Sequence, residues 1–106
     1  MNKLSYDKAN SGSLTIYEKL RSHFYLKLKN INYGQSTFIK KNVKIRCTDN
    51  AKINIGTGTL IQENSFILLT KPKPELIIGN NVNIGRGCII SIKDKMVIGN
   101  DVEIGP

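Results

Sequence analysis

Few side chains in this sequence could act as a catalytic base, a nucleophile or a metal ligand. His23 is the only histidine among the 106 residues, and histidine is the side chain best suited to remove a proton near neutral pH. A catalytic base needs a polar partner and a cleft, yet His23 lies beside Phe24 in a stretch that we expect to be helical. We therefore interpret it as a residue of the helix surface or of helix packing. A single histidine also argues against a zinc site built from three histidines, and we predict no metal site.

The other reactive groups favour structural interpretations as well. Cys47 and Cys88 are isolated in the sequence and lack the spacing of metal ligands, so we expect free thiols. Cys88 falls at a small inward position of the repeat described below, which favours core packing over a nucleophilic role. The glycine-rich stretch 55–59 imitates a phosphate-binding loop, but that reading requires a strand–turn–helix context, which is missing here.

The charge distribution and the apolar pattern indicate which partners to expect and whether the chain could span a membrane. The net charge is +8, from 16 basic and 8 acidic residues. Residues 1–30 carry half of it, so the charge is spread along the chain, whereas a nucleic-acid binder more often shows a basic stripe with interleaved aromatics. We expect no nucleic-acid partner, although the phosphates of a nucleotide-bearing cofactor would suit this charge. No apolar run approaches the length of a membrane span and the first ten residues are polar, so we expect a soluble cytoplasmic protein.

Isoleucine recurs at every sixth position, and this repeat predicts the fold. Ten of the eleven positions reached by steps of six are Ile, which no helical period of 3.6 residues would generate. The steps run from four starting residues, Tyr33, Ile55, Ile78 and Ile98. The starts lie 22, 23 and 20 residues apart, so each interval holds three hexapeptides and a short insertion. The insertions always follow the third hexapeptide, around residues 46–51, 68–74 and 91–94. This pattern predicts a three-sided coil whose loops stack at one corner.

A second set of positions indicates what fills the coil. Four residues after each Ile stands a small or β-branched residue, so equivalent side chains would stack as like-on-like ladders between successive strands. On the first two sides these residues are Thr37, Thr59, Val82, Val102, Val43, Ser65 and Cys88. Gly follows the first Ile of every coil, and Asn and Gly at the corners tolerate a left-handed backbone conformation. We therefore predict an all-β fold, a parallel β-helix of about 3.5 coils over residues 31–106.

Residues 1–30 form a separate N-terminal segment with a short α-helix. Thr15 and Glu18 have the spacing of a capping box, and the apolar residues that follow lie near one helical face. We predict an amphipathic helix over about residues 15–25 that covers the open end of the first coil. Its packing face would consist of Tyr17, Leu20, Phe24 and Leu28. The alternative is an irregular basic arm, and we expect residues 1–12 to be flexible.

The segments IIGNNVNIGRGCIIS (77–91) and MVIGNDVEIGP (96–106) resemble the hexapeptide-repeat acyltransferases. Within that family these segments most resemble the O-acetyltransferases that decorate capsule, O-antigen or small sugars. The resemblance covers about residues 33–106. It implies a left-handed parallel β-helix, since periodicity alone does not give the hand of the coil. It also implies a homotrimer that binds acetyl-CoA in a groove between neighbouring β-helices, with a sugar or glycan-precursor hydroxyl as acceptor.

The catalytic residues of the family have no counterpart in this chain. The resemblance implies that a histidine acts as general base and that backbone N–H groups stabilise the oxyanion. We expect this histidine within about one coil beyond Pro106, and we interpret the chain as the N-terminal part of the enzyme. Related sugar acetyltransferases often carry an Asn-aromatic-Asn stretch where this chain has Gly85, Arg86 and Gly87, so no acceptor-binding role is carried over. Asn83 and Arg86 belong to a coil that, in the family, often contacts the acceptor or the cofactor. These two residues are therefore candidates for substrate binding. The alternative is that their side chains simply point outward into solvent.

Two functions from different classes remain open. The resemblance favours an acetyl-CoA-dependent O-acyltransferase. The absence of every catalytic group from these residues favours a non-catalytic β-helix, either a scaffold or an oligomerisation module. An ice-binding β-helix is a minor third option, because its flat face needs repeated Thr and the pair Thr37 and Thr59 gives way to Val82 and Val102.

Overall fold

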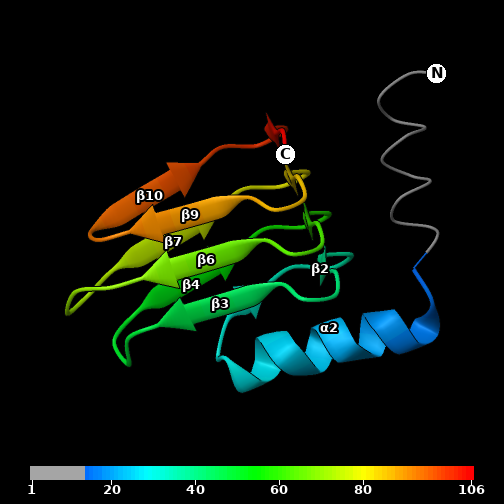
Figure 1. The fold of residues 1–106 in the computed structure, drawn as a ribbon, viewed down its shortest axis with the longest axis horizontal. Coiled ribbons are helices and arrows are strands. Elements are labelled where there is room, and N and C mark those ends of the chain that lie inside the picture. The colour runs from blue at the N-terminus through cyan, green and yellow to red at the C-terminus, as the bar shows by residue number, and fades with distance from the viewer. Residues whose placement is uncertain (1–13) are drawn as a thin grey trace.

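A computed structural model describes residues 14–106 and shows a parallel β-solenoid with one helix at its N-terminal end (Figure 1). Three parallel sheets form the three sides of the coil. The first sheet contains β1 (Asn32–Tyr33), β4 (Lys52–Ile55), β7 (Glu75–Ile78) and β10 (Lys95–Ile98). The second contains β2 (Phe38–Ile39), β5 (Leu60–Ile61), β8 (Asn83–Ile84) and β11 (Glu103–Ile104). The third contains β3 (Lys44–Cys47), β6 (Phe66–Leu69) and β9 (Ile89–Ile92).

The register of the strands confirms the predicted repeat. Tyr33 pairs with Ile55, Ile55 with Ile78, and Ile78 with Ile98, so the four predicted starts form one column. The described strands make three complete coils and two sides of a fourth. The insertions lie between the third and first sheets in each coil, as predicted. The left-handed sense of the coil remains an implication of the family resemblance.

The core is a stack of inward-facing aliphatic side chains. Ile45, Ile67, Ile61 and Ile84 are almost completely buried, and each such side chain contributes roughly 1.5–3 kcal/mol of transfer free energy. Alternate residues of each strand point inward, because a β-strand has a side-chain period of two. No single coil could bury this surface alone, so the stacking of coils holds the fold together.

The corners confirm the left-handed conformation at Asn81 and Gly58, whereas the first Gly of each coil does not adopt it. The left-handed backbone conformation falls two residues after the first Gly of each coil, at Ser36, Gly58, Asn81 and Asp101. Gly34, Gly56 and Gly79 are needed for a different reason, which is the close approach of the next coil. A Cβ atom on Gly56 would lie 2.7 Å from the carbonyl oxygen of Gly79, a distance that real Cβ contacts do not show.

The helix α2 (Ile16–Leu28) begins at the predicted capping box and ends three residues later than predicted. The Thr15 hydroxyl accepts the N–H of Glu18, and the Glu18 carboxylate accepts the N–H of Thr15, both at 3.0 Å. At the other end Asn30 adopts a left-handed conformation with φ 61°. The N–H of Ile31 reaches the carbonyl of Leu26, and both side chains join the core. This Schellman motif explains why the helix continues through Leu28.

The predicted packing face of α2 is wrong, although the helix does cover the first coil (Figure 1). The side chains buried on α2 are Ser22 and Leu26. The Ser22 hydroxyl accepts the N–H of Ile39, and the Tyr25 hydroxyl accepts the N–H of Ile45, both at 2.8 Å. The helix therefore satisfies donors at the open edge of β2 and β3. The residues predicted to pack, Tyr17, Leu20, Phe24 and Leu28, are exposed instead. The expectation for residues 1–12 lies outside the described residues.

Candidate functional site

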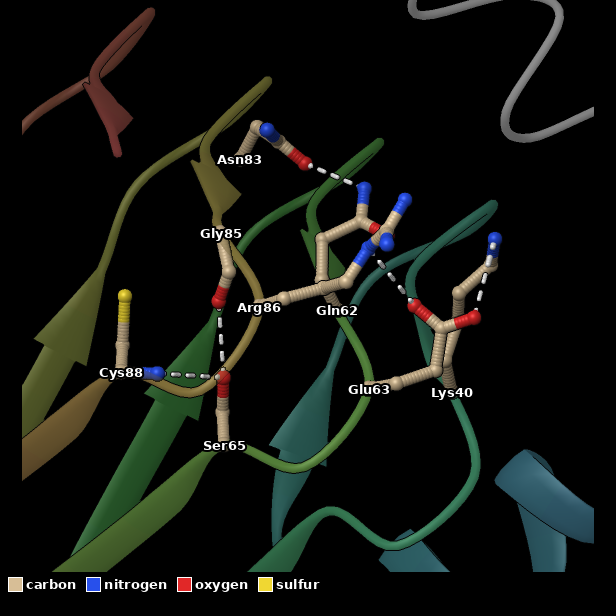
Figure 2. A network of polar contacts seen from close by, with 8 residues as sticks. All are labelled: Lys40, Gln62, Glu63, Ser65, Asn83, Gly85, Arg86 and Cys88. Carbon is tan, nitrogen blue, oxygen red and sulfur yellow. Dashed lines mark hydrogen bonds and ion pairs between the residues drawn. The ribbon is translucent and has the colours of Figure 1, made fainter. Parts of the chain in front are cut away.

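Of the two predicted substrate-binding candidates, Asn83 lies on β8 of the second sheet, and Arg86 lies in the corner that follows it, between the second and third sheets (Figure 2). In each coil the strand of the second sheet ends at an Ile, and the chain then turns within a few residues. Register therefore brings Lys40, Gln62 and Gly85 into one column. The next residues of the same coils include Glu63 and Arg86. We call the set Lys40, Gln62, Glu63, Asn83 and Arg86 the corner cluster.

The corner cluster contains one carboxylate between two cations. Lys40 Nζ lies 3.9 Å from Glu63 Oε2, and Arg86 Nε lies 3.6 Å from Glu63 Oε1. Both separations exceed a normal hydrogen bond, and Glu63 Oε1 is buried without a hydrogen-bond partner among the described residues. The Lys40 side chain is 12 % exposed and that of Arg86 is 73 % exposed. Arg86 is thus loosely held and keeps guanidinium donors for an anionic ligand.

Two amide side chains continue the cluster toward the C-terminal end. The Gln62 amide donates to Asn83 Oδ1 at 3.0 Å, and Gln62 is buried. This contact leaves the Gln62 oxygen and the Asn83 amide nitrogen with further hydrogen-bonding capacity. Such groups suit ligands that carry hydroxyl or amide groups.

A hydroxyl inside the corner holds successive coils at a fixed separation. Ser65 Oγ donates to the Gly85 carbonyl at 2.8 Å and accepts the N–H of Cys88 at 3.2 Å. Cys88 itself packs against the core, with its Sγ 3.1 Å from the Gly105 carbonyl oxygen. These contacts fix the backbone that carries Arg86 (Figure 2). The position of Cys88 against the core agrees with the packing role expected from the sequence.

The corner cluster borders an open cleft with a volume of about 290 Å³. Its walls come from three successive coils, and they combine amides, backbone of a glycine corner, the exposed cation Arg86 and the carboxylate of Glu103. The lining residues are Gln62, Asn83, Gly85, Arg86, Glu103, Ile104, Gly105 and Pro106. Arg86 and the amides offer donors to a polar group, and no histidine or cysteine is among the described residues that line the cleft.

His23 lies elsewhere, on the exposed surface of α2 as expected. Its Nδ1 is hydrogen-bonded to the hydroxyl of Tyr33, a partner that the sequence did not indicate. Together with Lys27, Asn32 and Gln35 these two residues line a second open cleft, of about 460 Å³, between α2 and β1. His23 does not line the cleft of the corner cluster.

Within residues 14–106, no three His, Cys, Asp or Glu side chains are grouped in a way that could hold a metal ion. Cys47 and Cys88 are both free thiols. In the same part of the chain no helix combines the length and apolar character that crossing a membrane requires.

The sequence singled out Asn83 and Arg86 but missed Lys40, Gln62 and Glu63. The signal was present, because these residues stand one or two positions after the second Ile of their coils. Aligning the coils by that Ile would have placed them beside the two candidates.

Comparisons of the chain with family models, with curated proteins and with solved structures found no match.

Proposed function

We propose that this chain belongs to an O-acyltransferase that uses acetyl-CoA and acts on a hydroxyl of a sugar or glycan precursor. The observation that carries the proposal is the exposed Arg86 guanidinium beside the amide-lined cleft of the β-solenoid. Phosphate groups of CoA are suitable partners for a guanidinium. Amides such as those of Gln62 and Asn83 can hydrogen-bond the amide groups of the donor or the hydroxyls of the acceptor.

In the proposed reaction the acceptor oxygen attacks the thioester carbonyl, the C–S bond breaks, and CoA leaves as a thiol. A general base takes the hydroxyl proton and returns it to the departing sulfur. Glu63 faces Lys40 and Arg86 and does not line the cleft, so it is not assigned the role of the base. The proposal therefore assigns substrate binding to the corner cluster. It assigns proton transfer to a histidine of the kind that the family resemblance implies.

The test is release of CoA by the natural gene product, measured with acetyl-CoA and a panel of sugar acceptors. Arg86→Gln removes the cation of the cleft, and the KM for acetyl-CoA should rise roughly tenfold because a charge-assisted contact is lost. The matched control is Arg46→Gln, another exposed arginine, which lies on β3 and should leave the KM unchanged. The proposal fails if no acceptor supports CoA release and the protein does not bind CoA in a calorimetric titration.

A trimer is part of the proposal, because the implied donor site lies in a groove between neighbouring β-helices. Sedimentation equilibrium of the natural gene product should then give three times the mass of its chain. Loss of activity on dilution below the dissociation constant of the trimer would support a shared site.

The second candidate is a non-catalytic scaffold or oligomerisation module. The absence of histidine from the lining of the cleft at the corner cluster favours it. The assay separates the two candidates: a scaffold releases no CoA with any acceptor, yet it still assembles into the same oligomer.

A further inference from the structure

We propose that the exposed face of α2 binds peripherally to an anionic phospholipid surface. The first observation is an apolar stripe that nothing in the described structure covers. Leu28 is 87 % exposed, Ile16 is 78 % exposed, and Tyr17, Leu20 and Phe24 are all more than half exposed. Ile16, Leu20, Phe24 and Leu28 follow one another at intervals of four, so they form one continuous row along the helix.

The row lies on the side of α2 that points away from the solenoid. Successive helical residues are rotated by about 100°, so the stripe is centred opposite the buried residues Ser22 and Leu26. Figure 1 shows α2 beneath the first coil, at the N-terminal end of the stack. A flat surface could therefore contact the stripe along the whole helix without meeting the three sheets.

Charge argues for an anionic surface as the occupant. The outward half of α2 carries the exposed cation Lys27 and no acidic residue, since Glu18 lies on the opposite half and is engaged at the helix N-terminus. Lys27 borders the stripe, and the whole chain carries a net charge of +8. Apolar residues bordered by cations are the pattern of helices that lie in the interface of a bilayer with anionic lipids.

The cleft between α2 and β1 adds room for headgroups at the edge of the stripe. His23 and Lys27, on the helix, line it beside Phe24 and Leu28, and Asn32 and Gln35 line the opposite side. A lysine, a histidine and amide side chains are donors that suit a phosphate group. The cleft is open to solvent, so a headgroup could enter it while acyl chains contact the stripe.

The same charges disfavour a second copy of the chain as the occupant. Packing two α2 helices face to face would bury Lys27 of each helix in an interface that has no acidic residue on that half of the helix. An anionic bilayer instead supplies the opposite charge to Lys27.

The direct test is a fluorescence titration with vesicles. The chain contains no tryptophan, so Phe24→Trp introduces a single reporter at the centre of the stripe. Its emission should shift to shorter wavelength with vesicles of two parts phosphatidylcholine to one part phosphatidylglycerol, and not with phosphatidylcholine alone. Ile89→Trp, which replaces an exposed apolar residue on β9, is the matched control and should show no shift.

Co-sedimentation with the same vesicles measures the affinity. Leu20→Ser combined with Phe24→Ser should weaken binding about tenfold or more, because the apolar contact is lost. Ile89→Ser combined with Val97→Ser should leave the affinity unchanged.

The charge contribution is tested separately. Lys27→Glu should weaken binding in low salt, whereas Lys73→Glu in the exposed turn before β7 makes the same charge change and should have a smaller effect. Circular dichroism checks that each variant remains folded.

Three results would overturn the proposal. The first is equal binding to the two kinds of vesicle, or no binding to either. The second is a chain that self-associates through this face, so that the Leu20→Ser/Phe24→Ser variant becomes monomeric in sedimentation and lipid has no effect. The third is a Phe24→Trp reporter that is already shielded without vesicles and becomes exposed when residues 1–13 are deleted. That result would make those residues the occupant of the stripe.

Discussion

The hydroxyl of Thr59 donates a hydrogen bond of 2.9 Å to the carbonyl oxygen of Gly79, in the next coil. The same hydroxyl accepts the N–H of Val82 at 3.2 Å. Thr37 repeats the arrangement one coil earlier, with Gly56 and the N–H of Thr59. A buried hydroxyl thus ties the corner of each coil to the corner of the next, at positions where the sequence shows only a small or β-branched residue.

We expect Thr59→Val to destabilise the protein although it preserves the shape of the side chain. Thr59 is completely buried, so the change leaves the Gly79 carbonyl without this donor and the Val82 N–H without this acceptor. The loss should be about 1–3 kcal/mol, measured as a lower midpoint of urea unfolding. Thr57→Val, at an exposed position of the same turn, is the control. Equal effects of the two substitutions would refute the role of the hydroxyl.

Gly56→Ala should also destabilise the fold, because the added methyl group meets the backbone of the next coil. The Cβ would lie 2.7 Å from the Gly79 carbonyl oxygen, and overpacking of this kind costs about 1–3 kcal/mol. Gly99→Ala provides a matched control within residues 14–106, since no atom lies within 4 Å of its added Cβ. Thermal unfolding followed by circular dichroism compares the two. An unchanged midpoint for Gly56→Ala would mean that the coils can separate at little cost.

The sequence predicted the solenoid because every coil carries its own copy of the same signal. Ile55, Ile78 and Ile98 each restart the six-residue pattern, and unequal insertions do not disturb it. The corner cluster has no such redundancy. Glu63 and Arg86 lie more than twenty residues apart in the sequence, and they meet only because the coils stack in register.

The helix face was predicted wrongly because apolar periodicity was taken as the sign of packing. In the structure α2 docks through Leu26 and through two hydroxyl groups that accept N–H groups of the first coil. Free strand edges demand hydrogen-bond acceptors, and Ser22 and Tyr25 provide them. A search for side chains able to accept the N–H groups of the first coil would have selected the face of Ser22 and Tyr25. A search for hydrophobic side chains selected the opposite face.

Ser22→Ala should therefore weaken the attachment of α2 to the solenoid. The substitution leaves the buried N–H of Ile39 without the acceptor that it has at 2.8 Å. The expected loss is about 1–3 kcal/mol, and amide exchange at Ile39 should accelerate because its partner is gone. Ser91→Ala, at an exposed site on β9, should change neither quantity. Unchanged exchange at Ile39 in Ser22→Ala would show that the serine does not protect this edge.

Acid should weaken the N-terminal end of α2 through Glu18. The hydrogen bond from the Thr15 backbone N–H lowers the pKa of Glu18 in the folded chain. A pKa lower in the folded than in the unfolded state gives a stabilisation that is present at neutral pH. That stabilisation disappears as the pH falls through the folded-state pKa of Glu18.

Glu18→Gln keeps a hydrogen-bond acceptor but removes the titration, so the acid-dependent part of the helix signal in circular dichroism should shrink. Asp49→Asn, in the exposed turn after β3, is the control and should leave the acid dependence as it is. A Glu18→Gln variant that loses helix on the same pH curve as the parent would place the titrating group elsewhere.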